Sequence, residues 1–502
     1  TEVYLQVMFE VLQQGKQVLV LVPEIGLTPQ TVARFKSRFH CDVALLHSGL
    51  NESKRLQAWQ HAQTGKASII IGTRSAIYTP LPKLGLIILD EEHDLSYKQQ
   101  EGFRYHARDV ALYRGHLQGC PVILGSATPS TESYHLAESG KLHLLELNQR
   151  AGVAVLPKMH IIDLKIAKKK HGISQTLIEQ IKQTLERKEQ VLIFLNRRGY
   201  APILMCESCA WQANCPHCDA HFTLHTQPYA YLHCHHCGTI NRLPEHCPEC
   251  KKQSLKTIGL GTAKLEEHLH ELFPHNEVIR VDRDSTSRVG SWQKIYDRIQ
   301  QNKPSILLGT QMLAKGHHFP HVTLVAILDI DSGLLSVDLR APERTAQLII
   351  QVAGRSGRGE HKGSVYLQTL RPDHPMLTTL IEKDYRAVAK QMLAERKIAM
   401  LPPYRYAALV RVDSKDRAYS QQYLAEIAQQ LREKAADLID IWGPIPAPME
   451  RKAGRYRAHM VILSADRAKL HFYLRQWWQH VVHLPRQHQL RLSIDVDPQE
   501  FS

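Results

Sequence analysis

Hydrophobic residues gather in short, nearly continuous runs over the first two thirds of the chain, and turn residues bound each run. The runs lie at residues 18–22, 69–71, 86–89, 121–124, 161–162, 191–195, 278–281, 306–308 and 322–328. Strands of a parallel sheet form such nearly continuous apolar runs because helices cover, and so bury, both faces of the sheet. Helical patterns alternate with the runs, so the sequence predicts an α/β fold with two parallel-sheet lobes.

The pattern changes after about residue 376. A charged helical segment leads to Leu401-Pro402-Pro403, where a helix must end because proline cannot continue its hydrogen bonding. Apolar runs at 407–412, 461–463 and 490–496 and a helical period at 419–431 predict a small α+β domain. The expected division is a first lobe at 1–155, a second lobe at 156–203 and 252–376, an inserted module at 204–251 and a C-terminal domain at 377–502.

Composition narrows the class of partner. The chain has 502 residues, 63 of them Lys or Arg and 49 Asp or Glu, giving a net charge of +14. This excess favours a polyanionic partner, with nucleic acid ahead of an anionic membrane. No apolar run is long enough to cross a bilayer, and no secretory signal is visible at the N-terminus.

Eight of the ten cysteines form four Cys-x-x-Cys pairs within a short stretch. The pairs are Cys206/Cys209, Cys215/Cys218, Cys234/Cys237 and Cys247/Cys250. Two such pairs complete a tetrahedral zinc site, so eight thiolates predict two zinc ions in closed, structural sites. Four pairs can be matched in three ways. The gap between the inner pairs fits a zinc ribbon and favours one site nested within the other, but an interleaved pairing stays open.

Candidate motor chemistry follows the run at 86–89, which leads into Asp90-Glu91-Glu92-His93. Parallel strands bind ligands at their carboxyl ends. There, Asp90 suits the magnesium site of a nucleoside triphosphatase, and Glu91 suits the positioning of the attacking water. By itself the motif fits an ordinary acidic loop equally well.

Further motifs follow other strand-like runs in order. They are Gly72-Thr73-Arg74-Ser75, Gly125-Ser126-Ala127-Thr128-Pro129, Gly309-Thr310-Gln311 with Lys315-Gly316, and a run from Gln351 that holds Arg355 and Arg358. The two arginines are three residues apart, which puts both on one face of a helix. Guanidinium groups suit the charge on a transferring phosphate.

Taken together, these motifs resemble those of superfamily 2 helicases. Longer runs at 90–109, 194–202 and 309–320 are similar to the PriA family of primosomal replication-restart helicases, and the resemblance covers essentially the whole chain. It implies two RecA-like lobes with ATP and Mg²⁺ between them, Asp90, Glu91, Arg355 and Arg358 being catalytic. The implied nucleotide-binding residues are Thr1, Glu92, His93, Lys315, Gly316 and Gln351.

The resemblance also implies the nested zinc pairing and the function. The expected activity is ATP-dependent 3′-5′ DNA unwinding that remodels stalled forks and starts primosome assembly. Expected partners are forked and single-stranded DNA, single-stranded DNA-binding protein, primosome proteins and the machinery that loads the replicative helicase, with no membrane. The expected location is the bacterial cytoplasm, in association with the nucleoid.

The start of the chain matches the end of the family's phosphate loop. That loop ends in Gly-Lys-Thr followed by Glu-Val-Tyr-Leu, and this chain begins Thr1-Glu2-Val3-Tyr4-Leu5. Thr1 would then coordinate magnesium, and the glycines and lysine would lie upstream. We therefore expect residues 1–502 alone to hydrolyse ATP poorly, because phosphate binding would lack its main electrostatic anchor.

Two basic stretches with interleaved aromatic residues are candidate DNA contacts, since bases stack on rings while cations hold phosphates. The predicted contacts are Arg74, Tyr97, Lys98, Phe103, Arg104, Tyr105, Arg455 and Arg457. The alternatives are an amphipathic segment that buries its aromatic residues and, at the C-terminal stretch, a solvated charged face.

Other functions stay open at this point. A fork-binding assembly scaffold would need the DNA and protein contacts but not ATP hydrolysis. An RNA helicase or duplex translocase would share the motor motifs, but the long matched runs favour a DNA helicase.

Overall fold

A computed structural model describes most of the chain. The residues outside the description are 1, 24–28, 148–156, 196–202, 207, 210, 219–220, 226–229, 235–236, 259–261, 283–284, 286–290, 311–312, 314–318, 337, 357–362, 436–437, 482–486 and 502. Among the described residues, no helix combines the length and apolar character needed to span a bilayer.

The first lobe is a five-stranded parallel sheet in the order β2-β3-β1-β4-β5. Its strands are β1 (Gln17–Leu21), β2 (Val43–Leu46), β3 (Ile69–Gly72), β4 (Leu84–Asp90) and β5 (Val122–Gly125). Its helices are α1 (Glu2–Gln13), α2 (Pro29–Phe39), α3 (Glu52–Gln63), η2 (Arg74–Tyr78), η3 (Leu95–Tyr97), α4 (Ala107–Gln118) and α5 (Thr131–Glu138). Two apolar clusters fill the lobe, one on each face of this sheet.

The second lobe is a six-stranded parallel sheet in the order β15-β16-β9-β17-β18-β6. Its strands are β6 (Lys158–Asp163), β9 (Gln190–Leu195), β15 (Glu277–Val281), β16 (Ser305–Gly309), β17 (Val322–Leu328) and β18 (Ser364–Thr369). Its helices are α6 (Gln175–Glu186), α7 (Thr262–Leu272), α8 (Ser291–Ile299), α10 (Asp331–Leu334) and α11 (Ala341–Ala353), with a small hairpin of β7 (Lys169–Lys170) and β8 (Ile173–Ser174). The two parallel-sheet lobes confirm the expected α/β class.

A small antiparallel sheet interrupts the second lobe between β9 and α7, in the order β13-β12-β11-β10-β14. Its strands are β10 (Ile203–Cys206), β11 (Thr223–His225), β12 (Tyr231–His233), β13 (Ile240–Arg242) and β14 (Leu255–Ile258). β14 pairs with β10 along its whole length, so the inserted module extends beyond residue 251, its expected end.

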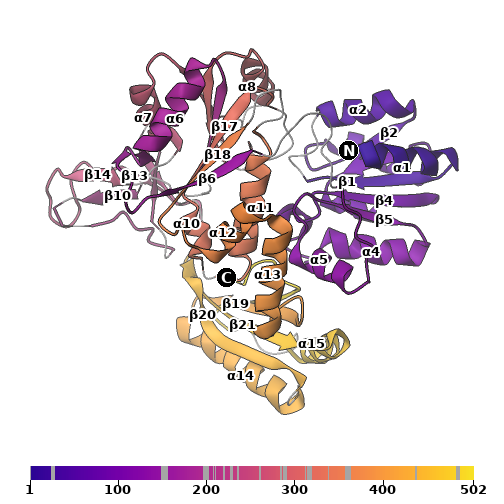
Figure 1. The fold of residues 1–502 in the computed structure, drawn as a ribbon. Helices are drawn as coiled ribbons and strands as arrows, with labels where there is room; N and C mark the ends of the chain where they lie inside the picture. The colour runs from indigo at the N-terminus through magenta and orange to yellow at the C-terminus, as the bar shows by residue number, and fades with distance from the viewer. Residues whose placement is uncertain are drawn as a thin grey trace.

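Helices α12 (Pro375–Glu382) and α13 (Tyr385–Ile398) share the apolar core of the second lobe. The compact C-terminal unit therefore begins after the proline pair near residue 403, rather than at residue 377. Figure 1 shows α11, α12 and α13 in orange at the centre of the molecule, between the two lobes and the yellow C-terminal domain.

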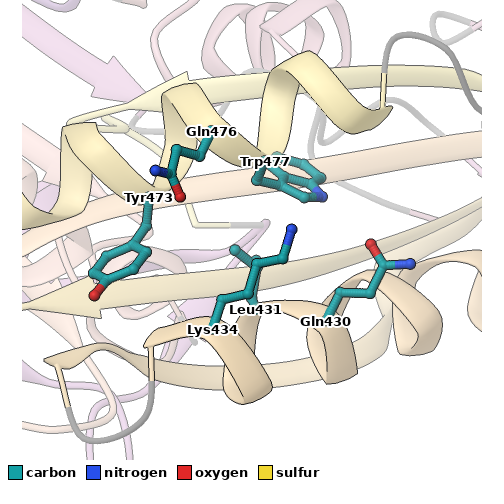
Figure 2. Close-up of a pocket in the computed structure, with 6 residues that line it drawn as sticks. All are labelled: Gln430, Leu431, Lys434, Tyr473, Gln476 and Trp477. Carbon is teal, nitrogen blue, oxygen red and sulfur yellow. The ribbon is translucent and has the colours of Figure 1, made fainter.

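The C-terminal domain has a four-stranded antiparallel sheet in the order β20-β21-β19-β22. Its elements are β19 (Tyr406–Ser414), α14 (Arg417–Ala435), β20 (Asp440–Lys452), β21 (Arg455–Ser464), α15 (Arg467–Val481) and β22 (Arg491–Val496). Residues of both helices and of the sheet form one apolar core. Figure 2 shows where α14 and α15 face each other, with Leu431 on one helix and Tyr473 and Trp477 on the other lining a narrow pocket.

Candidate functional site

Asp90 is the last residue of β4, at the carboxyl edge of the first sheet. The hydroxyl of Tyr4, on α1, donates a hydrogen bond to Asp90 Oδ1 at 3.0 Å. Burial raises the pKa of Asp90, and the hydrogen bond from Tyr4 opposes that rise. A nearby divalent cation would favour the charged carboxylate, so this position fits a magnesium ligand.

Glu91 adopts a left-handed backbone conformation with φ of 50°. This is uncommon for a residue other than glycine and is often found where a functional site requires it. The side chain is 39% exposed, and Oε2 lies 3.7 Å from Nδ1 of His93. An accessible carboxylate next to the strand end has the chemistry needed to orient a water molecule.

Glu92 faces the interior, which corrects the expectation that it binds nucleotide. It is 1% exposed and accepts hydrogen bonds from Ser130 N at 2.6 Å and from Ser133 Oγ at 2.8 Å. Ser130 Oγ also donates to it at 3.1 Å, and the guanidinium of Arg108 lies 3.6 Å away. Glu92 therefore holds the start of α5, and with it the end of the Gly125–Pro129 loop, against the Asp90-Glu91 turn.

His93 links the two lobes. Its Nδ1 lies 2.7 Å from Ser126 Oγ in the loop after β5, and its Nε2 lies 2.5 Å from Nε2 of Gln351 on α11. Arg355 follows the end of α11 and is buried, with 8% of its surface exposed. The structure thus brings the Asp90-Glu91 turn, through His93, into contact with Gln351 on α11 at one junction between the lobes, and Arg355 lies one helical turn further along the chain.

Four of the predicted nucleotide-site residues cannot be placed. Thr1, Lys315, Gly316 and Arg358 lie outside the described residues.

A buried polar network beside this junction was not expected from the sequence. Glu343 on α11 accepts hydrogen bonds from Thr131 N at 2.9 Å and from Thr131 Oγ1 at 3.0 Å, and pairs with Arg396 at 2.8 Å. Glu132 of the first lobe and Arg340 of the second form an ion pair across the lobes at 2.6 Å. These contacts fix the start of α5 on α11, the helix that leads to Gln351 and Arg355.

The cysteines form the two groups of the nested pairing. Cys206, Cys209, Cys247 and Cys250 make one group and Cys215, Cys218, Cys234 and Cys237 the other, with the sulfurs of each group within 4.8 Å of one another. Closest sulfur pairs are 3.5 to 3.6 Å apart, too far for disulfides. With Zn–S bonds of about 2.3 Å, a tetrahedral site places its sulfurs about 3.8 Å apart, so both groups fit zinc.

The inner cysteine group contacts the tip of the β20–β21 hairpin in the C-terminal domain. Ala453 N donates to Cys218 Sγ at 3.1 Å, and Gly454 N donates to the carbonyl of His217 at 2.7 Å. Nothing in the sequence indicated this contact, because the two segments lie in different domains.

The predicted DNA contacts on the hairpin have different environments. Arg455 is paired with Asp413 and also contacts the carbonyl of Gln489, so its guanidinium is engaged within the domain. This corrects its assignment as a phosphate contact. Arg457 is half-buried on the same strand, where it stays a candidate.

The aromatic stretch after the acidic motif divides into a buried and an exposed half. Tyr97 and Lys98 are 0% and 2% exposed, which corrects their assignment as DNA contacts because neither side chain is accessible. Arg74 is likewise engaged: its Nη1 donates to the carbonyls of Ser96 at 2.7 Å and Lys98 at 3.0 Å.

Phe103 is 78% exposed, and its ring stacks on that of Tyr105 with centroids 5.8 Å apart. Tyr105 in turn meets Tyr78 edge to face. Arg104 lies between these two residues in the sequence, and its Nε donates a hydrogen bond to the carbonyl of Gln100. The exposed half of the stretch therefore offers an aromatic face next to a cation.

The chain is similar to known helicases in several stretches along its length. Family models match residues 1–136 (DEAD/DEAH box helicase), 260–360 (helicase conserved C-terminal domain) and 397–499 (primosomal protein N C-terminal domain). Replication restart protein PriA of Haemophilus influenzae is 49% identical over 502 residues, covering 100% of this chain and 68% of that protein. Its Bacillus subtilis counterpart is 40% identical over 501 residues, covering 99% of this chain and 62% of that protein.

A third relative, replication restart protein PriA of Rickettsia conorii, is 37% identical and 77% of its length is covered. Among solved structures, RecG bound to a three-way DNA junction aligns with 78% of this chain and 42% of that chain, at 16% identity and a TM-score of 0.44.

Proposed function

The chain belongs to the PriA family of replication restart proteins, and on that premise we propose that it is an ATP-dependent 3′-5′ DNA helicase that remodels stalled forks and initiates primosome assembly. The observation that carries the proposal is the junction where the Asp90-Glu91 turn of one lobe meets Gln351 of the other through His93. The 3′-5′ direction rests on the family alone.

Each residue at the junction would have a distinct role in ATP hydrolysis. Asp90 would bind magnesium, which when bound with ATP supplies charge neutralisation at the phosphates. Glu91 would orient the attacking water and take up its proton. Arg355 would stabilise the charge that develops on the γ-phosphate. Thr1, Lys315, Gly316 and Arg358 complete the proposed nucleotide site.

The contacts between the lobes suggest how hydrolysis would produce motion. His93 hydrogen bonds both Ser126 in its own lobe and Gln351 in the other, so a change at the nucleotide would alter the contact between α11 and the first lobe. Closing and reopening of such a cleft moves the lobes along a strand.

ATP hydrolysis stimulated by different nucleic acids tests the proposal. The full-length protein should hydrolyse ATP fastest with forked DNA, more slowly with plain duplex, and slowest with RNA. Equal stimulation by RNA would favour an RNA helicase. Tight binding to a fork with no stimulation at all would favour the alternative function, an assembly scaffold that does not need its ATPase.

The aromatic face formed by Phe103 and Tyr105 is the proposed contact for single-stranded DNA. Phe103→Ala should weaken binding to a single-stranded oligonucleotide by about 1–3 kcal/mol, the usual contribution of a base stacked on an aromatic ring. Fluorescence anisotropy titrations would measure the change. Tyr113→Ala, which removes another exposed ring of the same lobe, is the matched control and should bind like the wild type. Equal losses in both variants would argue against a specific stacking site.

Both cysteine groups are proposed to hold structural zinc, and the module to recognise proteins or help separate strands. The proposed partners are single-stranded DNA-binding protein, primosome proteins and the loading machinery of the replicative helicase, in the bacterial cytoplasm at the nucleoid. Pull-down of these proteins by the full-length protein, with and without zinc, would test the assignment.

The poor hydrolysis of ATP by residues 1–502 alone stays a prediction. It is tested by comparing DNA-stimulated turnover of these 502 residues with that of the Haemophilus influenzae relative, and equal rates would refute it.

A further inference from the structure

Lys98 is a buried cation that the DNA-contact hypothesis leaves without a role. It is 2% exposed, and its ammonium lies 2.8 Å from Asp495 Oδ1 on β22 of the C-terminal domain. It also donates to the carbonyls of Val496 at 2.7 Å and Asp497 at 3.2 Å. Lysine is almost never fully buried unless it is paired, so the ion pair with Asp495 is what allows Lys98 to be buried.

The residue next to Lys98 contacts the nucleotide site. The hydroxyl of Tyr97 lies 2.7 Å from the carbonyl of Asp90 and 2.9 Å from the carbonyl of Leu21, at the ends of two central strands. Carbonyl oxygens only accept hydrogen bonds, so the Tyr97 hydroxyl is the donor in these contacts. Two adjacent side chains thus join the end of β4 to the C-terminal domain.

Arg74 holds the backbone immediately before and after Tyr97. Its hydrogen bonds to the carbonyls of Ser96 and Lys98 bracket Tyr97, so these three residues have little freedom to move independently. A displacement of Lys98 would therefore reach Tyr97, and through it the backbone of Asp90.

Residues 495–500, which we call the tail, bind Lys98 and also contact the second lobe. Arg344, on α11, contacts the carbonyl of Gln499 and lies 3.8 Å from the carboxylate of Glu500. The short tail from Asp495 to Glu500 therefore touches both lobes, on one side through Lys98 and on the other through the helix that carries Gln351.

We propose that Lys98 is a positioning residue that couples the C-terminal domain to the nucleotide site. The coupling runs from the tail through Lys98 and Tyr97 to Asp90, and it rests on the proposed function in that DNA is the ligand whose binding is relayed. Lys98 itself contacts neither DNA nor nucleotide. DNA held by the C-terminal domain would shift the tail relative to the first lobe and so alter the position of Asp90.

A double variant separates this role from a merely structural one. Lys98→Met alone would leave Asp495 buried with Arg411, 3.7 Å away, as its remaining cation among the described residues, and would destabilise the fold. Lys98→Met with Asp495→Asn replaces both charges by neutral groups of similar size. Arg467→Gln breaks the half-exposed pair with Asp497 on the same tail without touching Lys98, and serves as the matched control.

Hydrogen exchange of the full-length protein with and without a forked DNA oligonucleotide is the main measurement, because it does not require ATP turnover. In the wild type and in Arg467→Gln, DNA should change exchange both in the C-terminal domain and in residues 84–98. In the double variant, the change should persist in the C-terminal domain and vanish in residues 84–98. The ratio of DNA-stimulated to DNA-free ATP hydrolysis should fall about tenfold in parallel.

The outcomes distinguish the inference from the proposed function. If the wild type binds no forked DNA, the proposed function fails. If the wild type binds DNA and the double variant still transmits the change to residues 84–98, the function stands and the coupling role of Lys98 is wrong. Should the double variant not fold, Asp495→Asn alone is used, where the loss of the ion pair predicts a partial loss of transmission and unchanged transmission overturns the proposal.

Discussion

Replacing Glu91 by glutamine is expected to slow ATP hydrolysis by the full-length protein by about 10²- to 10⁴-fold, the range supplied by a positioned general base. The glutamine side chain keeps the size of the carboxylate but cannot accept a proton from water. ATP binding should change little, because Glu91 is not expected to hold magnesium or phosphate. Steady-state turnover and a nucleotide-binding titration would measure the two effects separately.

A matched control for this change is Glu138→Gln, which neutralises an exposed carboxylate at the end of α5 in the same lobe. It should hydrolyse ATP at the wild-type rate. If Glu91→Gln also kept wild-type turnover while still binding ATP, Glu91 would not be the residue that activates water, and the assignment of the Asp90-Glu91 turn as the catalytic centre would be wrong.

Removing zinc is expected to have the largest effect on stability. Structural zinc sites of this kind contribute about 10–16 kcal/mol of apparent binding energy, and a module with a small core depends on it to fold. Metal analysis should find two zinc ions for each chain. Cys218→Ser should lower that number to one, while Cys120→Ser, at a cysteine outside both groups, should keep two.

Zinc loss should also free the tip of the β20–β21 hairpin. The N–H groups of Ala453 and Gly454 bond to the inner cysteine module, so its unfolding removes both acceptors. Trypsin should then cut faster after Arg451, Lys452 and Arg455, as followed by mass spectrometry with and without a chelator. Unchanged cleavage after complete metal removal would show that the hairpin does not depend on the module for its protection.

The sequence predicted strands whose apolar residues form nearly continuous runs, whether central, like β4, or at an edge, like β5 and β15. Residues 86–89 are fully buried within β4, for example. Strand β18 was missed although it lies between β17 and β6, because polar residues take three of its six positions. Strand β2 was missed because it lies at the edge of its sheet and alternates between buried and half-buried residues over only four positions. Strand β20 was missed because it contains Pro444, Pro446 and Pro448, which are tolerated at this edge position.

The candidate site was predictable only where its residues are neighbours in sequence or follow strand ends. Asp90 and Glu91 could be assigned because a parallel sheet gathers strand ends at one edge. The roles of Glu92 and Lys98 could not, because they depend on partners brought near by folding: Ser130 and Ser133 for Glu92, and Asp495 for Lys98. A run of alternating basic and aromatic residues looks the same whether it faces DNA or another domain.

Strand separation on a forked DNA substrate tests the central claim most directly. With ATP and magnesium, the full-length wild-type protein should displace the strand, and the Glu91→Gln variant should bind the same fork without displacing it. If the wild type binds both ATP and the fork but displaces nothing, or if Glu91→Gln unwinds as fast as the wild type, the junction between Glu91, Gln351 and Arg355 is not the motor that drives this protein.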